Sequence, residues 1–115
     1  MPSTISGCYA EIRKYEALSS SISSLVSLLN SNEKNFENLK KSLQENYLVN
    51  SDITPVYDKT NNLSVDVNET SNYLKNTILP AIVSAIRALY RRIAELEAEA
   101  EAERRRQEEA SKAKS

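Results

Sequence analysis

The feature that most constrains the fold is a row of apolar residues that recurs at steps of three and four between Tyr15 and Leu43. Such a heptad predicts one long helix with a single apolar face. Two asparagines, Asn32 and Asn46, interrupt it, and each either fixes the register of a pairing or marks a solvated stretch. The two predicted core rows are Tyr15, Ile22, Leu29, Phe36 and Leu43, and Leu18, Leu25, Asn32, Leu39 and Asn46.

The heptad stops at residues 48–54, where Asn, Ser and Asp precede Pro55. Proline has no N–H to lose at the first helical position, and Thr54 before it can act as a cap, so a second helix is predicted to begin at Pro55. A connection of this length favours antiparallel neighbours. The sequence therefore predicts an all-α, antiparallel two-helix hairpin, with helices at about 8–48 and 55–96 and a turn at about 49–54.

The second helix carries a seam formed by Ile78, Ile82, Leu89 and Ile93. Several of its apolar residues are spaced by eleven, as Leu63 and Leu74 are, and this period is typical of a nearly straight helix. Pro80 lies inside the pattern, removes one backbone hydrogen bond and predicts a bend at that point.

The second helix is predicted to extend beyond its partner, to about residue 110. Residues 1–96 form the predicted hairpin domain, and residues 97–115 form a charged Ala/Glu/Arg helical tail with no apolar residue larger than Ala. The run Arg104-Arg105-Arg106 is either part of a solvated helix face or a patch for phosphate or an acidic partner. The flanking glutamates favour the solvated face.

Composition removes most other classes of protein. One glycine and no tryptophan argue against a many-stranded β fold. The absence of histidine and the single cysteine, Cys8, remove most metal sites, the Ser-His-Asp triad and any internal disulfide, and we expect no cofactor and no enzyme activity. A formal net charge of −1 does not suit a nucleic-acid partner.

No apolar run is long enough to predict a membrane span. The start of the chain, Met-Pro-Ser-Thr-Ile-Ser-Gly, has no basic region followed by an apolar one, so a cleaved secretory signal is not expected.

The second helix carries more apolar surface than one hairpin can cover. A second stripe adjoins its seam, and exposed apolar patches of this kind usually mark a protein interface. In the alternative, the N-terminal residues, with Ile5 and Tyr9, fold back over the stripe of a monomer. The predicted interface residues are Leu79, Val83, Ile86 and Tyr90, with Leu25 and Val26 across the hairpin.

A polar, Ser/Asn/Lys-rich hairpin over roughly residues 8–97, with a Leu79-Pro80 step in its second helix, resembles the small helical-hairpin proteins of Gram-positive type VII secretion. These include the Trp-x-Gly secreted proteins and the small partners encoded beside LXG-type toxins. Residues 47–55 lack the Trp-x-Gly motif, and Ala94 stands where the Tyr-x-x-x-Asp/Glu export signal would need an acid after Tyr90. Within the family, these departures point to a toxin partner or a divergent member.

The resemblance implies a homo- or heterodimeric four-helix assembly in the bacterial cytoplasm, or one exported without a cleavable signal peptide. The expected function is that of a non-enzymatic protein–protein interaction module: a type VII secretion substrate, or a partner or chaperone of a toxin's helical domain. The alternative is a self-assembling structural subunit of a phage or secretion apparatus that uses both stripes head to tail.

Overall fold

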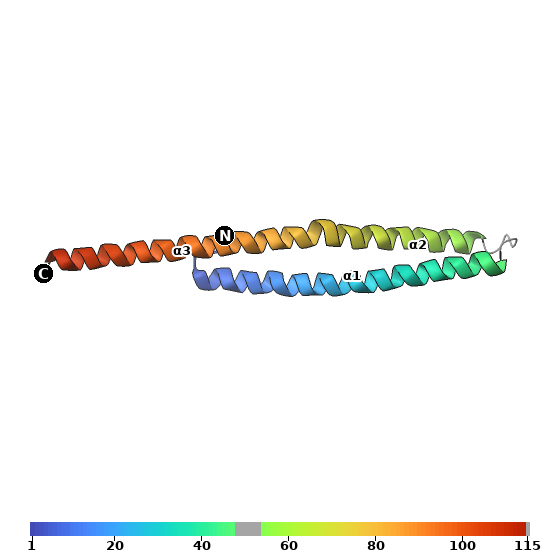
Figure 1. The fold of residues 1–115 in the computed structure, drawn as a ribbon, viewed down its shortest axis with the longest axis horizontal. Coiled ribbons are helices and arrows are strands. Elements are labelled where there is room, and N and C mark those ends of the chain that lie inside the picture. The colour runs from blue at the N-terminus through green and yellow to red at the C-terminus, as the bar shows by residue number, and fades with distance from the viewer. Residues whose placement is uncertain (48–53, 115) are drawn as a thin grey trace. The chain divides into compact units, whose positions relative to one another are not determined.

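The computed structural model describes residues 1–47 and 54–114, without the side chains of residues 46 and 47, and these residues form an all-α helical hairpin, as predicted. The first arm is α1 (Ile5–Tyr47). The second arm consists of α2 (Thr54–Tyr73), the π-helical turn η1 (Leu74–Ile78) and α3 (Leu79–Lys114). Figure 1 shows these elements in chain order. The predicted turn at 49–54 lies outside the described residues, apart from Thr54 at the start of α2.

Helix α1 begins before the predicted residue 8 because Thr4 caps it. The Thr4 hydroxyl accepts a hydrogen bond from the Gly7 N–H at 3.0 Å, and the Thr4 carbonyl accepts one from the Cys8 N–H. This is the N-cap arrangement that satisfies the free N–H groups of a first turn. A Cβ at Gly7 would lie 2.9 Å from the Thr4 hydroxyl oxygen, so a larger residue there would require the Thr4 side chain to shift.

The chain divides into two compact units, and each contains a stretch of both arms. Unit 1 comprises Met1–Leu18 and Ala81–Ser115, and unit 2 comprises Ser19–Pro80. Among the described residues, no helix is long and apolar enough to cross a membrane.

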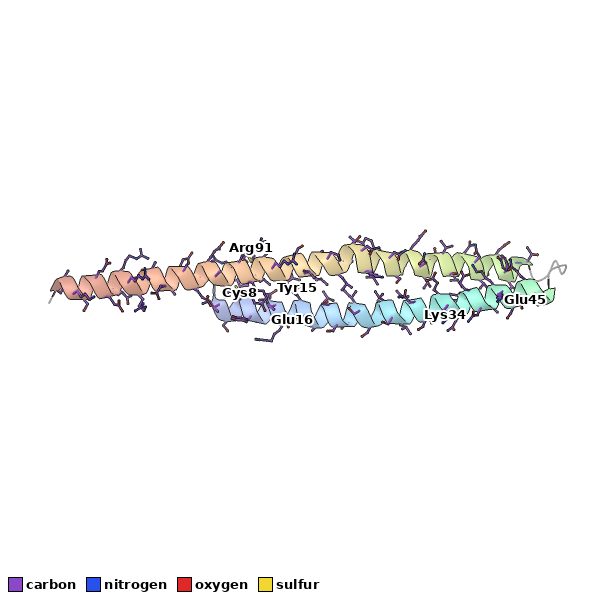
Figure 2. All side chains as sticks on the ribbon, viewed as in Figure 1. Cys8, Tyr15, Glu16, Lys34, Glu45 and Arg91 are labelled. Carbon is purple, nitrogen blue, oxygen red and sulfur yellow. The ribbon has the colours of Figure 1, made fainter. Side chains whose placement is uncertain are left out.

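Unit 1 is held together by an apolar cluster. Cys8 and Ile12 of α1 pack with Leu89 and Ile93 of α3, and all four side chains are buried. Figure 2 labels Cys8 on the side of α1 that faces α3. Four partly buried side chains surround the cluster: Ile5, Tyr15, Ile86 and Leu96. The predicted seam of the second helix is confirmed at its buried members, Ile82, Leu89 and Ile93.

Unit 2 is joined by polar side chains that pair α1 with α2 in an antiparallel register. As residue numbers rise in α1 from 30 to 44, those of their partners fall in α2 from 71 to 57. We call this set the polar ladder. Its bonds are Ser71 to Asn30 (2.8 Å), Ser64 to Glu37 (2.9 Å), Lys40 to Asn61 (3.0 Å) and Gln44 to Tyr57 (3.2 Å).

One of the two predicted core rows of α1 is correct and the other is wrong. Ile22 and Leu43 of the Tyr15 row are buried, and the other members of that row are partly buried. The described members of the Leu18 row are exposed instead, by 47% at Leu18 and 45% at Leu39, whereas the Asn46 side chain lies outside the described residues. The second inward row consists of Ile12, Ser19, Val26, Glu33 and Lys40. Polar members are tolerated there because the ladder supplies hydrogen-bond partners such as Asn61 for Lys40.

The turn η1 adds one residue to the second arm just before Pro80. The Leu79 N–H bonds to the Leu74 carbonyl, five residues back, as a π turn requires. In α2 the buried Thr60, Ser64 and Ser71 fit a pattern of alternating steps of four and three residues. If this pattern continued unchanged along the second arm, positions 81, 88 and 92 would face inward. The buried residues are Ile82, Leu89 and Ile93, each one residue later. The predicted irregularity beside Pro80 is therefore a π turn that changes the phase of the inward face.

Candidate interaction surfaces

The six predicted interface residues divide by their burial. Val26 is buried in unit 2, and Ile86 packs against the apolar cluster of unit 1, so both have partners within the chain. Leu79 is partly buried. The three exposed members are Leu25 (43% exposed), Val83 (44%) and Tyr90 (49%).

Three exposed apolar side chains of unit 1 lie along one edge of the helix pair. Val83 directly follows the buried Ile82, and Tyr90 directly follows the buried Leu89. Tyr9 of α1, which is also exposed, directly follows the buried Cys8. Residues that follow core residues on two antiparallel helices share an edge of the pair. We call Tyr9, Val83 and Tyr90 the tyrosine edge. Tyr9 is not among the predicted interface residues, although the heptad continued back from Tyr15 reaches Cys8, the residue before it.

The N-terminal residues occupy a different part of unit 1. Arg92 Nε donates to the Pro2 carbonyl at 3.4 Å. Beside this bond lies a pocket of about 310 Å³, lined by Met1, Pro2, Glu11, Tyr15, Ala85, Ala88 and Leu89. Neither Val83 nor Tyr90 lines this pocket, and both remain about half exposed. The N-terminal residues therefore leave about half of the surface of these two side chains exposed, and the alternative in which they cover the stripe stays a prediction.

In unit 2 the two edges of the helix pair differ in chemistry. One edge carries the polar ladder through Asn30, Glu37 and Gln44. On the other edge, Leu25 and Leu39 directly precede the inward Val26 and Lys40, and Leu63 of α2 directly precedes the buried Ser64. These three leucines, and Leu28 on the adjoining face of α1, are exposed. In unit 2, the polar side chains of the ladder therefore bond to one another between the two helices, and leucines lie at the surface.

Within the ladder, Glu37 makes both an ion pair and a hydrogen bond. Its carboxylate lies 2.7 Å from Lys40 Nζ and accepts a hydrogen bond from the Ser64 hydroxyl. The Lys40 and Ser64 bonds hold the pKa of Glu37 below its ordinary value, although partial burial opposes them. The ladder thus depends on an ionised Glu37.

The arginines of the tail are paired within their own helix. Arg104 bridges Glu101 and Glu108, Arg105 also contacts Glu101, and Arg106 contacts Glu103. The bond from Arg104 lowers the pKa of Glu101. Pairs at these spacings stabilise a solvated helix and leave the arginines partly neutralised, which favours the solvated-face interpretation of this segment.

Within residues 1–47 and 54–114, no group of three or more Cys, Asp or Glu side chains is arranged to hold a metal ion. Comparison of the chain with protein-family models, curated proteins and solved structures returned no match.

Proposed function

We propose that this chain is a non-enzymatic protein–protein interaction module that binds through apolar side chains left outside its own packing. The observation that carries this proposal is the tyrosine edge of unit 1. Val83 and Tyr90 lie on α3 beside the buried cluster and are about half exposed. Amphipathic side chains such as tyrosine are enriched at protein interfaces.

The resemblance to type VII secretion proteins supports a specific form of this role. In that form the chain is the small partner or chaperone of a toxin's helical domain, and the two helices of each protein form a four-helix assembly. The absence of Trp-x-Gly favours the partner over the secreted substrate.

A self-assembling structural subunit is the second candidate. It is favoured by further exposed apolar side chains of α2, Val65 and Tyr73. Contacts on several faces would join copies head to tail, without closure.

The test is isolation of the chain from its native cells under mild conditions, with native mass spectrometry of what it binds. We expect a complex of fixed stoichiometry. Replacing Val83 and Tyr90 by aspartate (V83D/Y90D) would force unpaired charge into the contact and release the partner. The matched control is S84D/R91D, one residue further along α3 at two exposed positions, which should retain the partner.

A chain that is recovered alone, at the mass of one copy, would contradict the proposal. So would equal retention of the partner by V83D/Y90D and S84D/R91D. Circular dichroism of both variants should show unchanged helix content, because all four positions are exposed.

A further inference from the structure

We propose that a second copy of this chain binds along the exposed leucine face of α1 in unit 2, with a two-fold axis beside Asn32. This inference rests on the proposed interaction function and names one partner for it. The contact is antiparallel: Leu25 of each copy packs against Leu39 of the other, and the two Asn32 side chains meet at the axis.

The face has the spacing of a second helix–helix seam. Leu25, Leu28, Asn32, Asn35 and Leu39 recur at alternating steps of three and four, and all five are exposed. This spacing keeps one stripe of a helix against a neighbouring helix. The first seam of α1 is already used within the chain, so these residues form an additional, unpaired seam.

The two leucines at the ends of the seam are symmetric about Asn32. Leu25 and Leu39 each lie seven residues from Asn32, and a two-fold contact brings a patch against itself. At the axis, each Asn32 carboxamide donates one N–H to the carbonyl oxygen of the other, so each carboxamide gains a partner when water is excluded. A polar residue such as Asn32 in a seam that contains leucines is a known means of fixing register.

The charge distribution of α1 selects the antiparallel direction. Between Glu16 and Glu33 the helix has no charged side chain, whereas six lie from Glu33 to Glu45: Glu33, Lys34, Glu37, Lys40, Lys41 and Glu45. An antiparallel contact centred on Asn32 lays the charged half of each copy against the serine-rich, uncharged half of the other. A parallel contact would place every charge opposite its own copy, and like charges brought together at an interface are costly.

The test uses the purified full-length chain with Asn32 replaced by cysteine (N32C) under mild oxidation. The two-fold axis brings the two introduced thiols together, so we expect rapid and nearly complete formation of a disulfide-linked dimer. S27C is the matched control, because Ser27 is exposed on another face of the same helix. The wild-type chain is the second control, since its Cys8 is buried.

Light scattering of charge variants gives an independent readout. L25D/L39D should reduce the mass from two chains to one, whereas S27D/K41D, with the same spacing at exposed positions two residues further along, should leave it at two. Failure of N32C to cross-link faster than S27C would overturn the two-fold seam, even if the chain still forms dimers. A wild-type chain with the mass of one copy throughout would also overturn it, and the native complex would then decide the proposed function separately.

Discussion

Leu89 carries much of the stability of unit 1 because it is buried in a small cluster with Cys8, Ile12 and Ile93. Replacing it with alanine removes buried apolar surface and leaves a cavity, so we expect L89A to lower the free energy of unfolding by about 2–5 kcal/mol. V65A, at a half-exposed position of α2, should change it by less than about 0.5 kcal/mol. Urea unfolding measures both, and equal effects would contradict the assigned core.

Glu37 makes the polar ladder sensitive to acid. Its pKa is below the ordinary value of 4.5, chiefly because of the hydrogen bond from Lys40, so its contribution to stability is complete above pH 4.5 and is lost as the pH falls through the lowered pKa. We expect an NMR titration of the Glu37 carboxyl carbon to give a midpoint below 4.5 in the wild type. In K40M the midpoint should rise towards that value. An equal midpoint in both proteins would show that Lys40 does not set the pKa.

At the scale of the elements, periodicity predicted both helical arms and the Tyr15 row of α1. It did not predict the second inward row, because leucines at 18, 25 and 39 are more apolar than Ser19, Glu33 and Lys40. The choice is made by the facing helix, where Asn61 accepts a hydrogen bond from Lys40 that a leucine could not donate. The sequence of one helix does not show which hydrogen-bond partners the facing helix presents to it.

The candidate surfaces were predicted only in part, for the same reason. Val83 and Tyr90 were placed correctly outside the seam, whereas Ile86 was assigned to the interface and packs against the cluster. The direction in which the α3 side chains face depends on the extra residue in η1. Pro80 predicted a bend at this point, but not the insertion of one residue. Extending the heptad back from Tyr15 would have reached Cys8, and with it Tyr9.

The one-residue phase shift at η1 predicts a tolerated deletion. Deleting the exposed Asn76 and replacing Pro80 with alanine (P80A) removes the extra residue of the π turn and the proline after it. The second arm can then form an unbroken α-helix in which Ile82 and Leu89 still face inward. We expect this variant to keep a cooperative thermal transition close to that of the wild type. Deleting the exposed Ser24 from α1, which has no π turn to absorb the change, should lower the melting temperature strongly. Similar losses in both variants would contradict the phase assignment.

At the scale of the whole molecule, the C-terminal part of α3 is a helix without tertiary packing. Residues 97–114 are exposed, and the ion pairs of Arg104, Arg105 and Arg106 lie within the helix itself. Such surface pairs contribute little to global stability. We expect truncation after Glu97 to leave the melting temperature nearly unchanged while the helical circular dichroism signal falls. A large loss of cooperativity would show that the tail docks on the rest of the chain.

The central claim is that the surface leucines and tyrosines bind protein, and a second copy is the partner that the symmetry and charge of α1 favour. Sedimentation equilibrium of the wild-type chain over a wide concentration range tests this most directly. We expect a mass that rises to two chains and then stays constant, because a two-fold contact closes on itself. The mass of one chain at every concentration would contradict the two-fold contact of α1, and a mass that keeps growing would favour the self-assembling subunit instead.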